Sequence, residues 1–313
     1  TNTFGWIVEI DPFASSERPV KRTALGRFAH EDCRASRAIS GQNLAFYMGD
    51  DSTGEYIYKF VSDSKWNPKD VNGGYAAGDK YMNNGKLYVA KFDFNEATQS
   101  ATGEWIELSI NNPLIANYDK YRFADQADVL VNTRLAGDAV GATKMDRPEW
   151  VAVNPKNGEV YVTLTNNGSR GRSYDTDAAN PRNYFDNDSG STSLSGNING
   201  HIIRLRENGD TTTALNFVWD IFLFGAEADS LENVNLSGLT DANDFSSPDG
   251  MWFDPRGVLW IQTDDGAYTN ETNCMMLAAL PGQVGDGQTK QAKSGDRTQL
   301  TPTGASLDDS KLR

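Results

Sequence analysis

The chain has 313 residues, enough to bury a large core either in one extended β unit or in two smaller domains. Its 43 acidic residues outnumber its 29 basic residues, which gives a net charge of −14. Such a surface repels nucleic-acid phosphates and anionic lipid, so we expect neither a nucleic-acid partner nor a membrane partner. The apolar run from Phe217 to Phe224 is too short to span a membrane and contains Asp220.

In chain order, the apolar pattern is that of β-strands almost throughout. The runs rich in Val, Ile, Tyr and Trp that predict strands are Trp6–Ile10, Leu44–Met48, Tyr56–Val61, Lys86–Phe92, Trp105–Leu108, Trp150–Val153, Val160–Thr165, His201–Leu205, Asn216–Trp219, Met251–Phe253 and Leu259–Gln262. Turn clusters such as Asn157-Gly158 separate them. Helical periodicity is sparse, with Tyr118–Val131 as its best example. Short strands at this spacing predict a sandwich, a barrel or a propeller.

One hairpin pattern occurs twice and favours the propeller. Glu149 stands five residues before an Asn-Pro turn, and Asp249 stands five residues before an Asp-Pro turn. A second strand follows each turn, and the two turns are 100 residues apart. That distance fits two blades of roughly 40–50 residues each. We therefore predict an all-β fold, specifically a β-propeller, complete or partial, with long irregular loop insertions.

The domain organisation follows from composition. Residues 1–280 are predicted to form one propeller domain, either whole or truncated. Within it, residues 166–200 are dense in Asn, Asp, Ser and Gly and read as a loop insertion. Residues 281–313 are polar with few apolar anchors, so we expect a weakly ordered C-terminal segment.

Three acidic side chains in separate motifs suggest a metal site. Glu31 closes Phe28-Ala29-His30-Glu31, Glu149 lies in Arg147-Pro148-Glu149, and Asp249 follows Pro248. Acids at the same end of repeated hairpins can point to one centre, and carboxylates brought together repel unless a cation neutralises them. The chain has two histidines and no paired cysteines, so the available ligands are oxygens, which suit calcium or oxidised iron better than zinc.

Each of these acids also has a purely structural interpretation. Glu31 could be a surface acid, Glu149 could only pair with Arg147, and Asp249 could belong to an ordinary Pro-Asp-Gly turn. Several further polar residues follow strands and are either turn residues or calcium ligands: Asp50, Asp51, Asn166, Asp264 and Asp265.

Five motifs resemble, in order, those of the PhoX-type bacterial alkaline phosphatases. They are the segments 21–31, 56–62, 147–155, 200–204 and 247–257, and the resemblance runs from about Thr3 to Leu280. Members of this family are hydrolases with a propeller fold and a mixed iron and calcium cofactor. The resemblance implies that Glu31, Glu149 and Asp249 are metal ligands and that Arg147 grips the substrate phosphate, because a planar guanidinium fork suits phosphate oxygens.

The same resemblance implies the biochemical setting. It implies hydrolysis of a small-molecule phosphate monoester, with Fe³⁺ and calcium as cofactors, by a monomer that is periplasmic or secreted. Two other classes stay open on the residues alone. One is a calcium-dependent propeller lactonase or esterase, which would use calcium alone and need no arginine in the site. The other is a non-catalytic propeller that serves as a binding scaffold.

The chain departs from the family pattern in its cysteines and at its ends. The family's thiolate ligand and further acids come from a segment that would precede Thr1, and the family continues past residue 280. Cys33 lies two residues beyond Glu31, where the family keeps no ligand, so we do not give it that role. Whether Cys33 pairs with Cys274 is left open. We expect a portion of the full enzyme, or a divergent relative, with little phosphatase activity of its own.

Overall fold

The computed structural model describes residues 2–13, 18–186, 194–264 and 273–313, and most of these residues lie in β-strands or the turns between them. The described residues contain four α-helices, all of them short: α1 Gly74–Met82, α2 Pro113–Ala116, α3 Gln126–Val131 and α4 Thr133–Ala139. The strands are β1 Val8–Glu9, β2 Val20–Lys21, β3 Arg34–Ala35, β4 Asn43–Gly49, β5 Ile57–Lys65, β6 Gly85–Asn95, β7 Ser100–Glu107, β8 Pro148–Val153, β9 Val160–Leu164, β10 Tyr184–Asp186, β11 Leu194–Gly196, β12 His201–Glu207, β13 Asn216–Phe224, β14 Pro248–Phe253, β15 Leu259–Thr263, β16 Met276–Ala279, β17 Thr289–Ser294 and β18 Arg297–Pro302. Within the described ranges, no helix combines the length and the apolar composition needed to cross a membrane.

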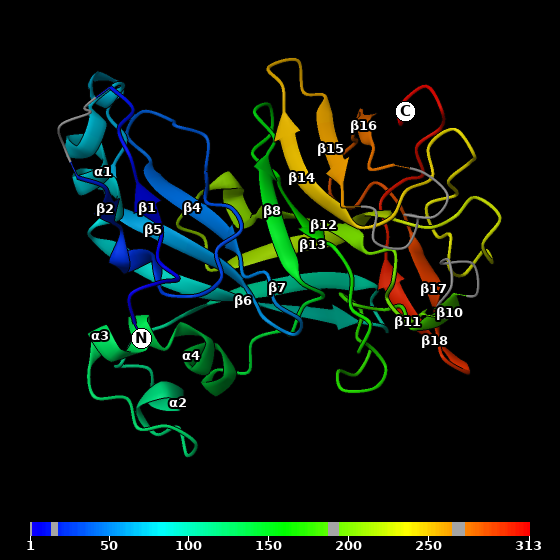
Figure 1. Ribbon diagram of the computed structural model, residues 1–313, viewed down its shortest axis with the longest axis horizontal. Helices are drawn as coiled ribbons and strands as arrows, with labels where there is room; N and C mark the ends of the chain where they lie inside the picture. The colour runs from blue at the N-terminus through cyan, green and yellow to red at the C-terminus, as the bar shows by residue number, and fades with distance from the viewer. Residues whose placement is uncertain (1, 14–17, 187–193, 265–272) are drawn as a thin grey trace.

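The main element is a nine-stranded antiparallel sheet in the order β3-β4-β5-β6-β7-β13-β12-β9-β8. It contains two four-stranded antiparallel runs, β4 to β7 and β8-β9-β12-β13, which are joined edge to edge by β7 and β13. The sheet curves until its ends meet, because β8 contacts both β3 and β4. Helices α2 to α4 gather at one corner near the N-terminus, and β14 to β18 lie on the opposite side (Figure 1).

The prediction of a β protein is confirmed, but strand pairing in the described residues does not divide the chain into separate propeller blades. The reason is the pairing of β7 with β13 over residues 102–104 and 216–218, which joins two runs of four strands into one sheet. The expected helix over Tyr118–Val131 is also shorter than predicted. It starts only at Gln126, because the Asp125 side chain accepts the backbone N–H of Asp128 at 2.9 Å and caps the first turn there.

The polar segment after residue 280, residues 281–313, contains the last two strands. Strands β17 and β18 form a hairpin, and β18 packs against β13. Three of its apolar side chains, Ala292, Leu307 and Leu312, are buried in the hydrophobic clusters of the preceding sheets. These few buried side chains are sufficient to hold the segment in place, because other strands already form the hydrophobic core into which they insert.

The two hairpins that share a sequence frame also share their turns. In β8–β9, the Asn154 side chain accepts the backbone N–H of Lys156 at 2.9 Å. In β14–β15, the Asp254 side chain accepts the backbone N–H of Arg256 at 2.9 Å. The Asx-Pro turn therefore closes both hairpins by the same local hydrogen bond, as the repeated frame predicts.

A buried ion pair holds the two four-stranded runs face to face. Lys59 on β5 donates to Glu207 on β12 at 2.9 Å, and the Glu207 carboxylate also accepts from Tyr47 and Trp105. Burial lowers the pKa of Lys59 to about 8 and raises that of Glu207, while the pairing opposes both shifts. An unpaired charge at either position would be strongly destabilising in this core. The ion pair therefore selects one relative arrangement of the two four-stranded runs.

The segment between β9 and β12, expected as a loop insertion, is tied down by a buried polar network. The Asp146 carboxylate accepts from Asn167 at 2.7 Å, from Arg170 Nε at 2.8 Å and from Asn197 at 2.9 Å. Arg182 in turn donates to the Asn197 side-chain oxygen. All of these side chains are buried. The described part of the segment is irregular in backbone but packed in its polar side chains.

His201 belongs to this network and should make stability depend on pH. Its Nδ1 accepts from Asn197 at 2.9 Å and its Nε2 donates to the Ala179 carbonyl at 2.8 Å, so the ring is held neutral. Burial lowers its pKa to about 4. The unfolded chain, with a pKa of about 6.5, therefore takes up a proton first as the pH falls. This one group should cost about 2 kcal/mol of unfolding free energy by pH 5.

Urea denaturation at pH 7.5 and at pH 5 measures this loss. The variant His201→Gln should lose less stability between the two pH values than the wild type does. His30, whose pKa burial also lowers to about 4, accounts for part of the remaining loss. An equal pH dependence in the variant and the wild type would contradict the assignment.

Candidate functional site

The two acid-bearing hairpins share a backbone distortion at the acid. Arg147 and Ser247, each two residues before the acid, have left-handed φ angles of 55° and 53°. The strand register then shifts between Pro148 and Val151 and again between Pro248 and Met251, so that each acid lies in a β-bulge. Bulges re-aim side chains, and left-handed non-glycine residues are uncommon and often mark functional sites. In both hairpins, therefore, a left-handed residue followed by a β-bulge sets the direction of the carboxylate.

A close backbone approach brings β4 to the same place. A Cβ added at Gly49, the last residue of β4, would overlap the carbonyl oxygens of Pro148 and Glu149. The Gly49 carbonyl also accepts the Glu31 backbone N–H at 3.3 Å. Glycine at this position lets the segment carrying Glu31, the end of β4 and the start of β8 meet at one point.

Arg147 lies at the centre of this meeting point. Its Nε is 2.9 Å from Asp51 Oδ1, and its Nη2 is 3.2 Å from Asp51 Oδ2, which makes a two-pronged pair. Nη2 also lies 2.8 Å from Glu149 Oε1. Among the described residues, Nη1 has one contact, a long one of 3.5 Å with the side-chain oxygen of Asn166. The Nε and Nη2 edge of the guanidinium is thus fixed by Asp51, whereas the described residues hold Nη1 only by the long contact with Asn166.

The carboxyl groups around Arg147 act on one another electrostatically. Burial and then the charges of Asp249 and Asp51 raise the pKa of Glu149 far above its usual range. Burial and the charges of Asp264 and Asp51 raise the pKa of Asp249, and its side chain is hydrogen-bonded to that of Glu149. Burial, Asp51 and Asp249 raise the pKa of Glu31. Five carboxyl groups therefore share one site with a single guanidinium.

The structure thus brings the three predicted acids together, and their role as metal ligands stays a prediction. The donors fit a hard cation in kind, because they are carboxylates with one amide oxygen. Within the part of the chain that the structure describes, however, no three His, Cys, Asp or Glu side chains form a ready-made ligand set. Arg147 engages Asp51 and Glu149, and Glu149 is bonded to Asp249. A cation would have to replace those bonds.

Asp50 and Asp51, which the sequence could not tell apart, have different roles. Asp51 faces the site and holds Arg147, whereas Asp50 is fully buried and pairs with Arg134 on α4. Both residues lie in the turn that follows β4, so the sequence carries no strand alternation that would tell which of them reaches the site. Of the other candidates, Asp264 acts on Asp249, and Asp265 lies outside the described residues.

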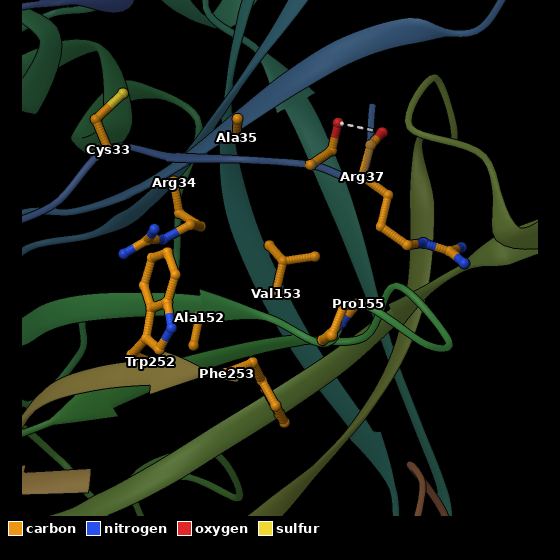
Figure 2. A pocket seen from close by; sticks show the side chains of 10 residues that line it. Cys33, Arg34, Ala35, Arg37, Ala152, Val153, Pro155, Trp252 and Phe253 are labelled. Carbon is orange, nitrogen blue, oxygen red and sulfur yellow. Dashed lines mark hydrogen bonds between the residues drawn. The ribbon is translucent and has the colours of Figure 1, made fainter. Parts of the chain in front are cut away.

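Cys33 has no part in the acid cluster. Cys33 and Cys274 are both free thiols, and burial raises the pKa of Cys33 to about 12, which disfavours a thiolate ligand. Cys33 lines a separate cavity of about 440 Å³ between β3, β8 and β14, in which Arg34 stacks 4.7 Å from the ring of Trp252 (Figure 2). On β8 it is lined by Ala152 and Val153, and on β14 by Trp252 and Phe253, which stand three and four residues beyond Glu149 and Asp249.

Fold and site together define a mostly β protein in which the acidic ends of repeated hairpins surround one arginine. Residues 1–306 match the family described as alkaline phosphatase PhoX, and the chain belongs to that family. A solved structure of Pseudomonas fluorescens PhoX, in complex with the transition-state analogue vanadate, is 38% identical to it with a TM-score of 0.74. The match covers 93% of this chain and 50% of that chain, so this chain spans about half the length of that relative. The comparison with curated proteins found no match.

Removing one acid should stabilise the metal-free protein. Asp249→Asn keeps the hydrogen bond with Glu149, because the amide can donate to a carboxylate, and it removes repulsion from Asp51 and Asp264. We expect a gain of about 1 kcal/mol in unfolding free energy in the presence of EDTA. Asp220→Asn is the matched control: Asp220 pairs with Arg204 at 2.6 Å, so the same change there should destabilise. Destabilisation by both changes would mean that Asp249 is an ordinary structural acid.

Proposed function

We propose that this chain carries the phosphate-recognition and metal-binding part of a phosphomonoesterase that hydrolyses small phosphate monoesters. The observation that carries the proposal is the placement of Arg147, held on one edge by Asp51 within a cluster of acids. Anionic substrates avoid acidic surfaces, so a lone guanidinium among carboxylates makes chemical sense only if cations and a bound anion complete the charge balance.

The geometry of Arg147 suits a phosphoryl oxygen. Asp51 occupies the Nε and Nη2 edge and so fixes the plane of the guanidinium. Nη1, whose only described contact is the 3.5 Å approach to Asn166, is the donor that an incoming oxygen would meet. In this position Arg147 would also take up charge that develops on the phosphoryl group in the transition state. The similarity to a PhoX protein crystallised with vanadate supports this role.

Glu31, Glu149 and Asp249 would hold the cations, with Asp51 and Asp264 beside them. The family resemblance implies Fe³⁺ and calcium as those cations. When bound, they would supply positive charge against the phosphoryl oxygens and lower the pKa of a water nucleophile. The protein's own contribution is to hold the Glu149 and Asp249 carboxyl groups beside each other, where their mutual repulsion favours the binding of a cation.

We also propose that the strand runs described above are blades of a propeller. The two four-stranded runs and the three-stranded sheet β14-β15-β16 each begin with an inner strand, β4, β8 or β14, and β8 contacts both of the other two. Inner strands of propeller blades converge in this way around a channel. A periplasmic or secreted location and a monomeric state belong to the same proposal, because they rest on the family resemblance alone.

The alternative functions are less well supported. A lactonase or esterase built around calcium alone has no use for an arginine, yet Arg147 is the centre of the cluster. A non-catalytic scaffold has no need for carboxyl groups whose burial and mutual repulsion raise the pKa of Glu31, Glu149 and Asp249. Asp220, a buried acid elsewhere in the fold, is instead paired with Arg204.

Arg147→Ala in the complete protein tests the assigned role. We expect kcat/KM for a simple aryl phosphate to fall on the order of 10- to 1000-fold, because one charged donor is lost from the transition-state clamp. The metal content should be unchanged. Arg256→Ala, at an exposed arginine that pairs with Asp254, is the control and should leave both quantities unchanged. Loss of metal together with activity would make Arg147 a structural residue.

Elemental analysis of untreated protein distinguishes the three function classes. Iron together with calcium is the expected result for the phosphatase. Calcium alone would favour the lactonase or esterase, and the absence of both metals would favour the scaffold. A double variant, Glu149→Gln with Asp249→Asn, should lose the metal, whereas the remote acid change Asp210→Asn should retain it.

A further inference from the structure

We propose that Arg134, on helix α4 and outside the acid cluster, is a positioning residue that sets the orientation of Arg147. It acts through two consecutive acids, Asp50 and Asp51. The Arg134 guanidinium pairs with the Asp50 carboxylate, and the Asp51 carboxylate pairs with Arg147. The structural part of this inference stands on contacts alone, and its consequence for phosphate binding rests on the proposed function.

The first contact is a two-pronged ion pair. Arg134 Nε lies 2.8 Å from Asp50 Oδ2, and Nη2 lies 2.5 Å from Asp50 Oδ1. Nη2 also donates to the Ser52 hydroxyl at 3.0 Å. One guanidinium therefore holds residues on both sides of Asp51 in the turn that follows β4. Such a planar fork fixes direction as well as distance.

Asp50 depends on this pair. It is fully buried, and burial raises its pKa, while the hydrogen bonds and the charge of Arg134 lower it. Besides Arg134, its carboxylate accepts the Ala29 backbone N–H at 3.2 Å. Without the guanidinium, the carboxylate would be buried with far too little compensation, so it would take up a proton or move toward water. Either response shifts the turn.

The turn passes any such shift directly to Asp51. The Asp51 backbone N–H donates to the Ala29 carbonyl at 2.9 Å, and the Ser52 N–H donates to the Asp50 carbonyl at 2.7 Å. Ala29 is thus held by Asp50 and Asp51 together, two residues before Glu31. The Asp51 side chain then holds Nε and Nη2 of Arg147. A two-pronged pair tolerates little displacement, so a small shift of Asp51 would turn the Arg147 fork.

Helix α4 is also tied to the segment that carries Glu31. The neighbour of Arg134 in the helix, Thr133, accepts the Arg27 backbone N–H at 3.0 Å through its hydroxyl. The same short helix therefore sets both the Asp50–Ser52 turn and the approach to Glu31. Arg134 itself makes no described contact with Arg147, Glu149 or Asp249, so its influence on them must pass through Asp50 and Asp51.

Selective ¹⁵N-arginine labelling gives a direct measurement of this coupling. The Arg147 Nε–H signal, assigned by its loss in Arg147→Lys, should be shielded from solvent exchange in metal-free wild-type protein, because it donates to Asp51. In Arg134→Lys, which keeps the charge but loses the fork, the signal should shift, and its exchange should speed up about tenfold. Arg204→Lys is the matched control, since Arg204 makes a similar two-pronged pair with Asp220 remote from the site.

An unchanged Arg147 signal in folded Arg134→Lys would overturn the proposal, and so would an equal change in Arg204→Lys. If Arg134→Lys fails to fold, Asp50→Asn breaks the same pair while keeping its shape, and it should produce the same shift. This measurement needs neither metal nor substrate, so it decides the coupling even if the proposed function is wrong.

The functional consequence is measured separately by binding of inorganic phosphate and vanadate to the complete protein. Arg134→Lys should weaken both about tenfold at unchanged metal content, whereas Arg204→Lys should leave them unchanged. Failure of the wild type to bind either anion would overturn the proposed function. The coupling between Arg134 and Arg147 would then be decided by the Arg147 Nε–H signal alone. Unchanged affinity in Arg134→Lys, with a displaced Arg147 signal, would overturn the link between that orientation and phosphate recognition.

Discussion

The site depends on backbone geometry that holds the Glu149 and Asp249 carboxyl groups together despite their mutual repulsion. Left to themselves, Glu149 and Asp249 would turn toward water and away from each other. Each instead lies in a bulge two residues after a left-handed residue, and the hairpins that carry the bulges are anchored by core packing and by Asx turns. The free energy that keeps like charges together therefore comes from burial elsewhere in the sheets. Functional sites commonly draw on stability in this way.

A second regularity connects the site with the interior of the protein. Asp146 and Arg147 are neighbours, as are Asp50 and Asp51. In each pair, the first residue is fully buried in a polar network, and the second reaches into the site. Each functional side chain thus has a rigid support one peptide bond away. Because each support is the direct chain neighbour of the residue that it positions, this arrangement gives precise placement without filling the site itself.

The sequence predicted the hairpin frame and the meeting of Glu31, Glu149 and Asp249, because Asx-Pro turns and strand alternation are local signals. It could not predict the pairing of β7 with β13, since nothing in either strand marks its partner across more than a hundred residues. Nor could it separate Asp50 from Asp51, or foresee that Leu307 and Leu312 would anchor a polar tail. The Asn- and Arg-rich segment after β9 read as a loop for the same reason: its polar side chains satisfy one another through contacts that composition does not reveal.

That network limits how readily the segment after β9 can open. A surface lid opens by breaking a few solvent-exposed contacts. The part of the segment that holds Asn167, Arg170 and Asn197, by contrast, would have to expose buried charges together with Asp146. Such an opening approaches local unfolding in its cost and would be correspondingly rare. The described part of this segment is therefore not a readily opened lid beside Arg147, which Asn166 contacts.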